Sequence, residues 1–230
     1  MPKTLTIDFI SDIACPWCVI GLGGLDRALE RLRGEVSAEI VFHPFELNPA
    51  MQAGGENSLE HITKKYQISA QEARINRERI QARAREVGFT MNTSDSSRVY
   101  NTFDAHRLLA WAKSTGKQHA LKQQLFVLYF TEQKDPGDPR ELIGAAQAAG
   151  LDPEKASAVI QSDRFSEEVR SEEALWRGRG ISAVPAVVVN DRYLISGGQP
   201  ADEFERQLRE IALEQAIPRE RRRVSASHRS

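Results

Sequence analysis

The sequence has 230 residues and a formal net charge of -1, with 31 basic against 32 acidic side chains. This balance provides no general positive field for nucleic acid or for an anionic membrane, so we expect neither partner. No apolar run reaches the roughly 18 to 20 residues of a membrane-spanning helix, while 40% hydrophobic residues suffice for a sizeable core.

The first predicted element is a buried strand over residues 5–10, which leads into Cys15-Pro16-Trp17-Cys18 and a helix over 20–33. The chain contains no other cysteine. A strand followed by a C-x-x-C pair at the start of a helix is the setting in which two thiols carry out redox chemistry.

The start of this helix assigns a role to each sulfur. With Cys15 as the N-cap, Pro16 falls at the first helical position, where its missing N–H is not needed. The Cys15 sulfur then faces unpaired N–H groups and the positive end of the helix dipole, which favours a thiolate. We therefore expect Cys15 to attack a disulfide and Cys18, one turn further in, to resolve the product.

Three other uses of a cysteine pair fit this sequence less well. Zinc needs two further ligands, and the five histidines show no H-x-x-x-H pairing. An iron–sulfur cluster needs about four cysteines, and a disulfide across so short a loop constrains little of the unfolded chain. We expect no metal and no bound cofactor. With no recognisable export signal and no further cysteines, we expect a cytoplasmic protein.

A second strand is predicted at 38–43, and after it only helices are predicted as far as about residue 178. Four of their starts carry capping signals: Asn57, Ser69, Asp138 and Asp152. The segment 72–85 interleaves five arginines with glutamates at helical spacing. A solvated, salt-bridged helix surface explains this pattern, and a nucleic-acid contact is the minor alternative.

Strands return at 186–189 and 193–196, which predict an antiparallel hairpin around Asn190-Asp191-Arg192. A last helix is predicted from Pro200.

A βαβ half at the front and a ββα half at the back therefore flank an all-helical insert. This order is that of a thioredoxin fold of the α/β class with an inserted helical domain. We expect a discontinuous thioredoxin-like domain at 1–50 and 179–215 and the inserted helical domain at 51–178. Residues 216–230 form a basic tail with little to bury, which we expect to be disordered.

The second half of the predicted site is Val184-Pro185, which directly precedes a strand. Proline cannot donate to a strand ladder, so it marks a strand start or a cis turn. Beside a C-x-x-C pair in this layout we expect a cis bond that brings Val184 against the dithiol. The N–H and C=O of Val184 are then placed to pair with an extended substrate segment.

Three further side chains are candidates, each with a structural alternative. Asp8 interrupts an apolar strand and is either a proton acceptor for Cys18 or an acid at a strand edge facing water. His106 either lines a groove above the cysteines or is an ordinary packing residue. Trp17 lies between the cysteines, and we expect it to be exposed as an apolar platform for substrate.

The sequence resembles the DsbA-like branch of the thioredoxin superfamily, specifically the cytoplasmic FrnE-type proteins. The resemblance rests on the following segments: Ser11-Asp12-Ile13-Ala14-Cys15-Pro16-Trp17-Cys18, Phe45-Glu46-Leu47-Asn48-Pro49, Ala105-His106-Arg107-Leu108, Gly180-Ile181-Ser182-Ala183-Val184-Pro185 and Ser196-Gly197-Gly198-Gln199. It implies an inserted helical domain, a cis Pro185, and thiol–disulfide oxidoreductase activity with Cys15 as an exposed nucleophile. Pro16-Trp17 departs from the Pro-His pair of strongly oxidising DsbA, so we expect a less oxidising potential.

The same branch includes glutathione-dependent enzymes, the 2-hydroxychromene-2-carboxylate isomerases and the kappa-class glutathione transferases. These are similar to the chain in the cis-proline loop and the Gly-Gln segment, but they typically carry Ser where Cys15 stands. The resemblance therefore keeps glutathione open as a co-substrate, bound near Val184 and Gln199.

Three functions follow, and the first is favoured. It is a dithiol–disulfide oxidoreductase that acts on protein or small-molecule thiols and disulfides through a mixed disulfide on Cys15. The second is a glutathione-dependent isomerase or transferase, and the third is a non-catalytic holdase that uses the insert as a peptide-binding groove. The sequence leaves open whether the chain is a monomer or a homodimer.

Overall fold

The computed structural model describes residues 2–214. The predicted basic tail at 216–230 lies outside the described residues. Within residues 2–214, none of the helices is both long enough and apolar enough to cross a membrane.

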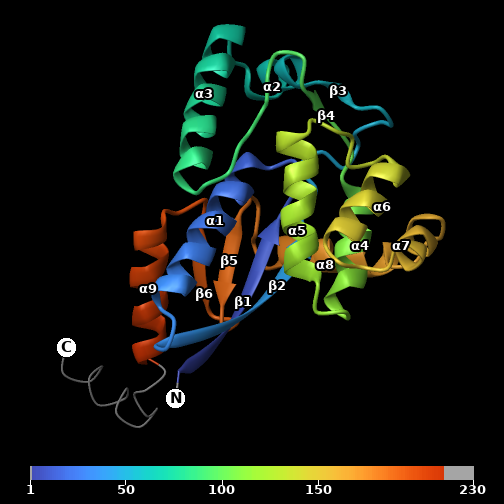
Figure 1. Ribbon diagram of the computed structural model, residues 1–230. Coiled ribbons are helices and arrows are strands. Elements are labelled where there is room, and N and C mark those ends of the chain that lie inside the picture. Colours follow the sequence, from blue (N-terminus) through green and yellow to red (C-terminus); the bar gives the residue numbers. More distant parts are fainter. Residues whose placement is uncertain (1, 215–230) are drawn as a thin grey trace.

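A four-stranded mixed sheet forms the centre of the molecule (Figure 1), in the order β2-β1-β5-β6. Its strands are β1 (Lys3–Ser11), β2 (Val36–Pro44), β5 (Ala186–Val189) and β6 (Tyr193–Ser196). β1 runs parallel to β2 and antiparallel to β5, which forms the predicted hairpin with β6. The α/β class expected from the sequence is confirmed, and the sheet joins the two ends of the chain.

The alternation of side chains along β1 divides the core in two. Leu5, Ile7 and Phe9 are fully buried in a large cluster that contains both cysteines and the buried sides of α1 (Pro16–Arg31) and α9 (Ala201–Glu214). These two helices lie side by side (Figure 1). Ile10 is one position out of phase with Ile7 and Phe9, so it belongs instead to a small cluster on the other face of the sheet.

The helices between β2 and β5 occupy residues 58–178. They are α2 (Ser58–Tyr66), α3 (Ala70–Glu86), α4 (Phe103–Lys113), α5 (Gln118–Phe126), α6 (Pro139–Ala148), α7 (Pro153–Ile160) and α8 (Ser166–Gly178), with a π-helical turn at Val127–Thr131. The predicted caps are confirmed, because the side chains of Asn57, Ser69, Asp138 and Asp152 each accept a hydrogen bond from the first turn of the following helix.

The insert shares its core with the sheet. Leu108, Leu121 and Leu125 are fully buried in the same cluster as Phe9 of β1. The insert therefore packs as part of one hydrophobic core, and the boundaries at 51 and 178 stay a prediction about chain organisation.

The prediction of helices alone across this region was wrong in one place. β3 (Glu56–Asn57) pairs antiparallel with β4 (Arg98–Val99) in a two-residue ladder. Gly55 makes this approach possible, since a Cβ there would lie 2.0 Å from the Val99 carbonyl oxygen. Two residues are too few for a period-2 pattern to be visible in the sequence.

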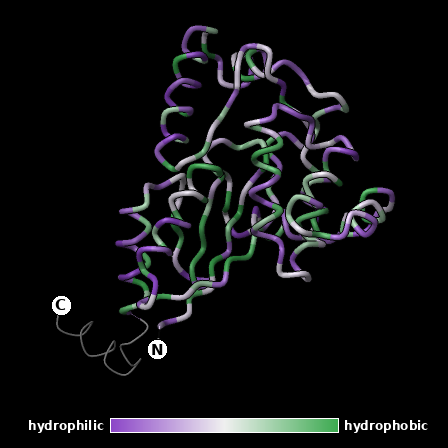
Figure 2. The backbone as a smooth tube through the Cα atoms, viewed as in Figure 1, coloured by the Kyte–Doolittle hydropathy of each residue, from purple (hydrophilic) through white to green (hydrophobic). Residues whose placement is uncertain are grey.

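The arginine-rich helix α3 has only Ala73 and Ala84 buried along its length. Figure 2 shows it as a largely hydrophilic tube at one end of the molecule. Arg74 and Arg77 both form ion pairs with Asp95, at 2.9 and 2.7 Å. These contacts support the interpretation of α3 as a solvated, salt-bridged surface.

Candidate active site

The two cysteines lie where β1 ends and α1 begins. Cys15 is the N-cap with φ −93° and ψ 111°, and Pro16 occupies the first helical position. The Cys18 N–H donates to the Cys15 carbonyl at 3.0 Å, which closes the first turn. The predicted geometry of the pair is confirmed, and the Cys15 sulfur stands at the positive end of the α1 dipole.

The three side chains of this turn differ sharply in exposure. Trp17 is 38% exposed, as predicted, whereas Cys15 is 3% exposed and Cys18 is fully buried. The family resemblance implies an exposed nucleophile, and this expectation is wrong, because Cys15 is almost completely covered. Its Sγ donates to the Val184 carbonyl at 3.5 Å, and this loop supplies part of the cover.

The Val184–Pro185 peptide bond is cis, and it places the carbonyl of Val184 against Cys15 from 169 residues away along the chain. Val184 is half-buried and Pro185 is buried. Gly21 allows Pro185 to approach α1, since a Cβ at Gly21 would lie 3.1 Å from Pro185 Cγ. The structure thus brings both sequence-predicted halves of the site together.

The Gly197-Gly198-Gln199 segment closes the same region from β6. A Cβ on Gly198 would lie 2.8 Å from the Trp17 carbonyl oxygen, so only glycine fits this contact without a shift. The Gln199 amide donates to the Ser196 carbonyl at 2.7 Å, within its own turn. Gly198 therefore packs on the turn between the cysteines, whereas the Gln199 carbonyl lies against Gly24, further along α1, and the Gln199 side-chain amide is engaged in holding its own turn.

Asp12 is a buried acid beside the dithiol that the sequence analysis assigned no role. Its carboxylate accepts hydrogen bonds from the N–H of Leu47 at 2.7 Å and of Ala14 at 3.3 Å, and lies 3.4 Å from His106 Nε2. Burial raises the pKa of Asp12, but His106 and the Leu47 N–H outweigh burial and hold it below its usual 3.8. Asp12 is therefore an ionised group that ties the cysteine loop to the segment that follows β2 and to α4.

His106 does not line an open groove. Only 2% of the residue is exposed, and its ring contacts Asp12 from the buried side of α4, where Ala105, Leu108 and Leu109 are also buried. The structure corrects its placement as a substrate-binding residue and favours the packing alternative, with the addition that His106 helps to keep Asp12 ionised.

Both predictions for Asp8, a proton acceptor for Cys18 or an acid at a strand edge facing water, were wrong. Asp8 lies in the central strand β1, two residues before Ile10. Residues two apart on a strand share a face, so Asp8 projects, like Ile10, to the face of the sheet opposite Cys18. There it contacts His43 Nε2 at 2.8 Å, while Glu172 contacts His43 Nδ1 at 2.9 Å. Asp8 is therefore neither beside Cys18 nor at a strand edge in water.

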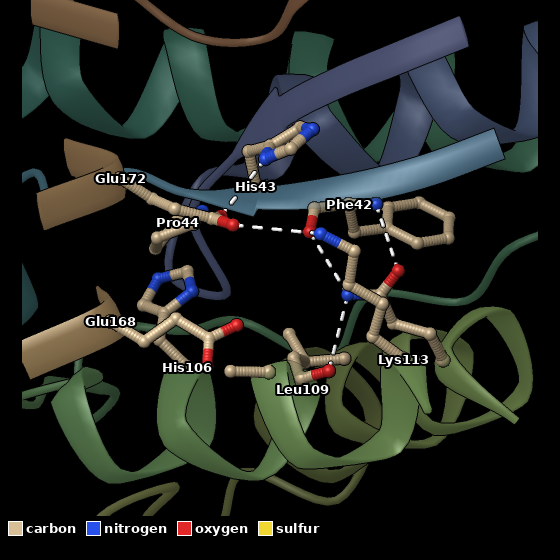
Figure 3. Close-up of a pocket in the computed structure, with 10 residues that line it drawn as sticks. Phe42, His43, Pro44, His106, Leu109, Lys113, Glu168 and Glu172 are labelled. Atoms are coloured by element: carbon tan, nitrogen blue, oxygen red, sulfur yellow. Dashed lines mark hydrogen bonds and ion pairs between the residues drawn. The ribbon is translucent and has the colours of Figure 1, made fainter. Parts of the chain in front are cut away.

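His43 and Glu172 also line a small cavity together with His106 and Lys113 (Figure 3). Burial lowers the pKa of His43, but the two carboxylates outweigh burial and raise it above 6.5. Neither cysteine lines this cavity. It is separate from the dithiol and belongs to the contact between β2 and the helices.

Lys122 of α5 is a second buried group that the sequence analysis missed. The residue is fully buried, and burial lowers its pKa from 10.5 to about 8, an effect opposed by the charges of Cys18, Asp12 and Cys15. Burial and the hydrogen bond from Cys15 raise the pKa of Cys18 well above 9.0, and the Lys122 charge acts in the opposite direction. A lysine within the apolar series Leu121, Leu125 and Phe126 was the available signal.

The arrangement is suited to exchange between a dithiol and a disulfide. One thiol lies at a helix N-terminus beneath a backbone carbonyl, and the second lies deeper on the same turn. Among residues 2–214, no cluster of three or more His, Cys, Asp or Glu side chains is arranged to hold a metal ion. A C-x-x-C turn opposite a cis-proline loop defines the site as that of a thioredoxin-like redox protein.

A model of the DsbA-like thioredoxin domain matches residues 6–209. The chain belongs to this family, and its thioredoxin fold with an inserted helical region is the DsbA-like one.

Known proteins agree with this assignment. A probable DsbA oxidoreductase from Streptomyces coelicolor superposes with a TM-score of 0.84 at 32% identity, covering 93% of this chain and 92% of that one. The uncharacterized protein YwbO of Bacillus subtilis is 25% identical over 206 residues, which are 89% of this chain and 96% of that protein. The cytosolic disulfide reductase DsbM from Pseudomonas aeruginosa, solved with glutathione, shares the fold at a TM-score of 0.61 and 18% identity, covering 91% and 99%.

Proposed function

We propose that this protein is a thiol–disulfide oxidoreductase that exchanges its Cys15–Cys18 dithiol with protein or small-molecule disulfides. The observation that carries the proposal is the placement of Cys15 at the N-terminus of α1, with its sulfur 3.5 Å from the Val184 carbonyl. A helix N-terminus favours the thiolate, which is the nucleophile in exchange.

The proposed reaction has two displacements. The Cys15 thiolate attacks one sulfur of a substrate disulfide, the substrate S–S bond breaks, and one substrate thiolate leaves. Cys18 then loses its proton and attacks Cys15 Sγ, which forms the Cys15–Cys18 disulfide and releases the second substrate sulfur as a thiolate that takes up a proton. The substrate gains two electrons and the protein loses them, and the reverse sequence oxidises a substrate dithiol.

Substrate recognition rests on the surface around Cys15. The backbone of Val184 offers an N–H and a carbonyl to an extended segment, and Trp17 offers an exposed apolar ring beside it. No bound cofactor is needed, since both electrons are carried by the sulfurs. Glutathione is proposed as a co-substrate, in keeping with its presence in the similarly folded DsbM. A reducing, cytoplasmic setting suits a chain whose only cysteines form this pair.

The direct test compares Cys15→Ser with the unchanged protein in insulin reduction by dithiothreitol and in oxidative refolding of a reduced protein. We expect Cys15→Ser to remove all activity above background, because no other thiolate is placed to attack. Cys18→Ala should instead accumulate a mixed disulfide on Cys15, visible as a mass increase that dithiothreitol reverses.

Two results would redirect the assignment. Activity that requires glutathione and survives Cys18→Ala would favour the isomerase or transferase alternative. Suppression of aggregation by a protein lacking both cysteines, without any thiol turnover by the unchanged protein, would favour the holdase. Unchanged insulin reduction by Cys15→Ser would exclude the proposed role of this dithiol.

A further inference from the structure

Lys122 is a fully buried ammonium whose Nζ has no hydrogen-bond partner within residues 2–214. Its Nζ lies 5.0 Å from the centroid of the Phe126 ring, which is a weak substitute for water. A buried, unpaired charge loses its hydration without compensation, which destabilises the folded state. A methionine or leucine would fill the same space without this cost, so packing alone does not account for a lysine.

The position of Lys122 is fixed by the helix that carries it. One turn earlier, the Gln118 side chain bonds both the N–H and the carbonyl of Phe42 in β2, each at 2.9 Å. Residues four apart share a helix face, so Lys122 projects toward the same sheet. Phe42 packs edge-on against Phe9 at 5.6 Å between ring centroids, and Phe9 lies in the cluster that contains Cys18.

We propose that Lys122 stabilises the Cys18 thiolate that forms in the resolving step, so that the helical insert supplies a charge to the redox centre. This inference rests on the proposed thiol–disulfide exchange. Lys122 acts through the Cys18 sulfur and does not meet the substrate, so it is a positioning residue for that step.

The resolving step needs such a charge because burial disfavours ionisation of the Cys18 thiol. Burial and the Cys15 hydrogen bond raise its pKa well above 9.0, and only a thiolate can attack Cys15 Sγ. When Cys18 ionises, a buried cation nearby offsets the loss of hydration of the new anion. The other charge close by, Asp12, is already engaged by His106 and by the Leu47 N–H.

The test separates the two displacements with dithionitrobenzoate, an aromatic disulfide that releases one coloured thiolate at each step. The first release reports attack by Cys15, and the second reports attack by Cys18 on the mixed disulfide. Lys122→Met and Lys122→Gln remove the buried charge at similar side-chain length. Lys117→Met is the matched control, because it removes the same charge from an exposed position at the start of α5.

At pH 7 we expect Lys122→Met and Lys122→Gln to slow the second release at least about tenfold, the effect of one pKa unit at Cys18. The first release should change less than about threefold, because the charge of Lys122 acts most strongly on Cys18. Raising the pH should restore the second release in both variants by increasing the Cys18 thiolate fraction. Lys117→Met should match the unchanged protein in both phases.

Two outcomes overturn this role: a second release equal to that of Lys117→Met, or equal slowing of both releases, which is the signature of a general structural defect. The reagent does not depend on the natural substrate. If the unchanged protein shows both releases but no insulin reduction or refolding activity, the proposed function fails while the role of Lys122 stands on the second release alone.

Discussion

The two faces of the central sheet each bury a cluster of charged side chains, and the two clusters are built in opposite ways. On the face away from the cysteines, His43 contacts Asp8 at 2.8 Å and Glu172 at 2.9 Å, so the imidazolium has an acceptor at each nitrogen. On the cysteine face, Lys122 is buried with no hydrogen-bond partner among the described residues. The charge of His43 therefore has hydrogen-bond partners, and the charge of Lys122 has none among the described residues.

This difference separates structural from reactive use of buried charge. A fully paired cluster has little capacity to respond to a further charge, so the His43 cluster is suited to joining α8 to the sheet. An unpaired cation raises the energy of the resting fold but is available to an anion that appears only during a reaction. Breaking the first should therefore destabilise the protein, and neutralising the second should stabilise it.

The largest expected effect is at Asp12, which connects the cysteine loop both to the segment that follows β2 and to α4. Asp12→Ala should lower the free energy of unfolding by about 3–5 kcal/mol, because it leaves the Leu47 and Ala14 N–H groups without their acceptor and His106 without its carboxylate. Urea denaturation at pH 7 measures this loss.

Asp12→Asn is the control for Asp12→Ala, since it keeps one acceptor oxygen and should lose clearly less. The pKa of Asp12 is lowered in the folded protein, so its contribution is present above pH 3.8 and is lost as the pH falls through the folded pKa. A loss under about 1 kcal/mol for Asp12→Ala at pH 7 would show that the loop is held by other contacts.

Lys122→Met should change stability in the opposite direction. The fall in the pKa of this fully buried group from 10.5 to about 8 corresponds to about 3 kcal/mol that the folded protein loses by burying the ammonium. We expect Lys122→Met to recover up to about this amount in urea denaturation of the reduced protein at pH 7, while slowing the resolving step.

The pH dependence identifies the cause of this gain. The unfolded chain binds the extra proton between pH 8 and 10.5, so the stability of the unchanged protein rises through that window. The advantage of Lys122→Met should therefore be largest below pH 8 and disappear toward pH 10.5. A gain that is the same at pH 7 and pH 10 would come from packing and not from the removed charge.

The sequence predicts those features of the site that depend on local chemistry. Cys15 as the N-cap, Pro16 at the first helical position and the hairpin after Pro185 follow from helix-start and strand signals within a few residues. The four helix caps at Asn57, Ser69, Asp138 and Asp152 belong to the same group, because each is a contact between a side chain and its own next turn.

Features that depend on which face of an element is covered were missed or misassigned. Asp8 and Phe9 are neighbours in sequence, and only the packing of α1 and α8 on opposite sides decides which of them meets Cys18. The same difficulty applies to Lys122, since its spacing along α5 is compatible with either a solvent-facing or a core-facing side chain. Local sequence does not distinguish these cases, because the deciding contacts come from other elements of the fold, such as His43 of β2, 35 residues from Asp8 along the chain.

The smallest of these effects is expected at the paired cluster. His43→Ala should lower the free energy of unfolding by about 2 kcal/mol near pH 6, because Asp8 and Glu172 lose a shared partner but are each partly exposed and regain some hydration. His43→Gln, which keeps a polar group without the charge, should lose part of this amount.

The pH profile separates this charge effect from the loss of side-chain volume. The folded pKa of His43 is raised, so its charge contributes fully below pH 6.5 and the contribution is lost as the pH rises through the folded value. The folded pKa of Glu172 is lowered, so its contribution is present above pH 4.5. The loss in His43→Ala should therefore be greatest between pH 4.5 and 6.5 and should shrink in alkaline solution, while the two dithionitrobenzoate phases stay as in the unchanged protein. An equal loss at pH 6 and pH 9 would mean that His43 acts only through its contact with Trp176, 5.0 Å between ring centroids, and that the two faces of the sheet differ less in their electrostatics than their contacts indicate.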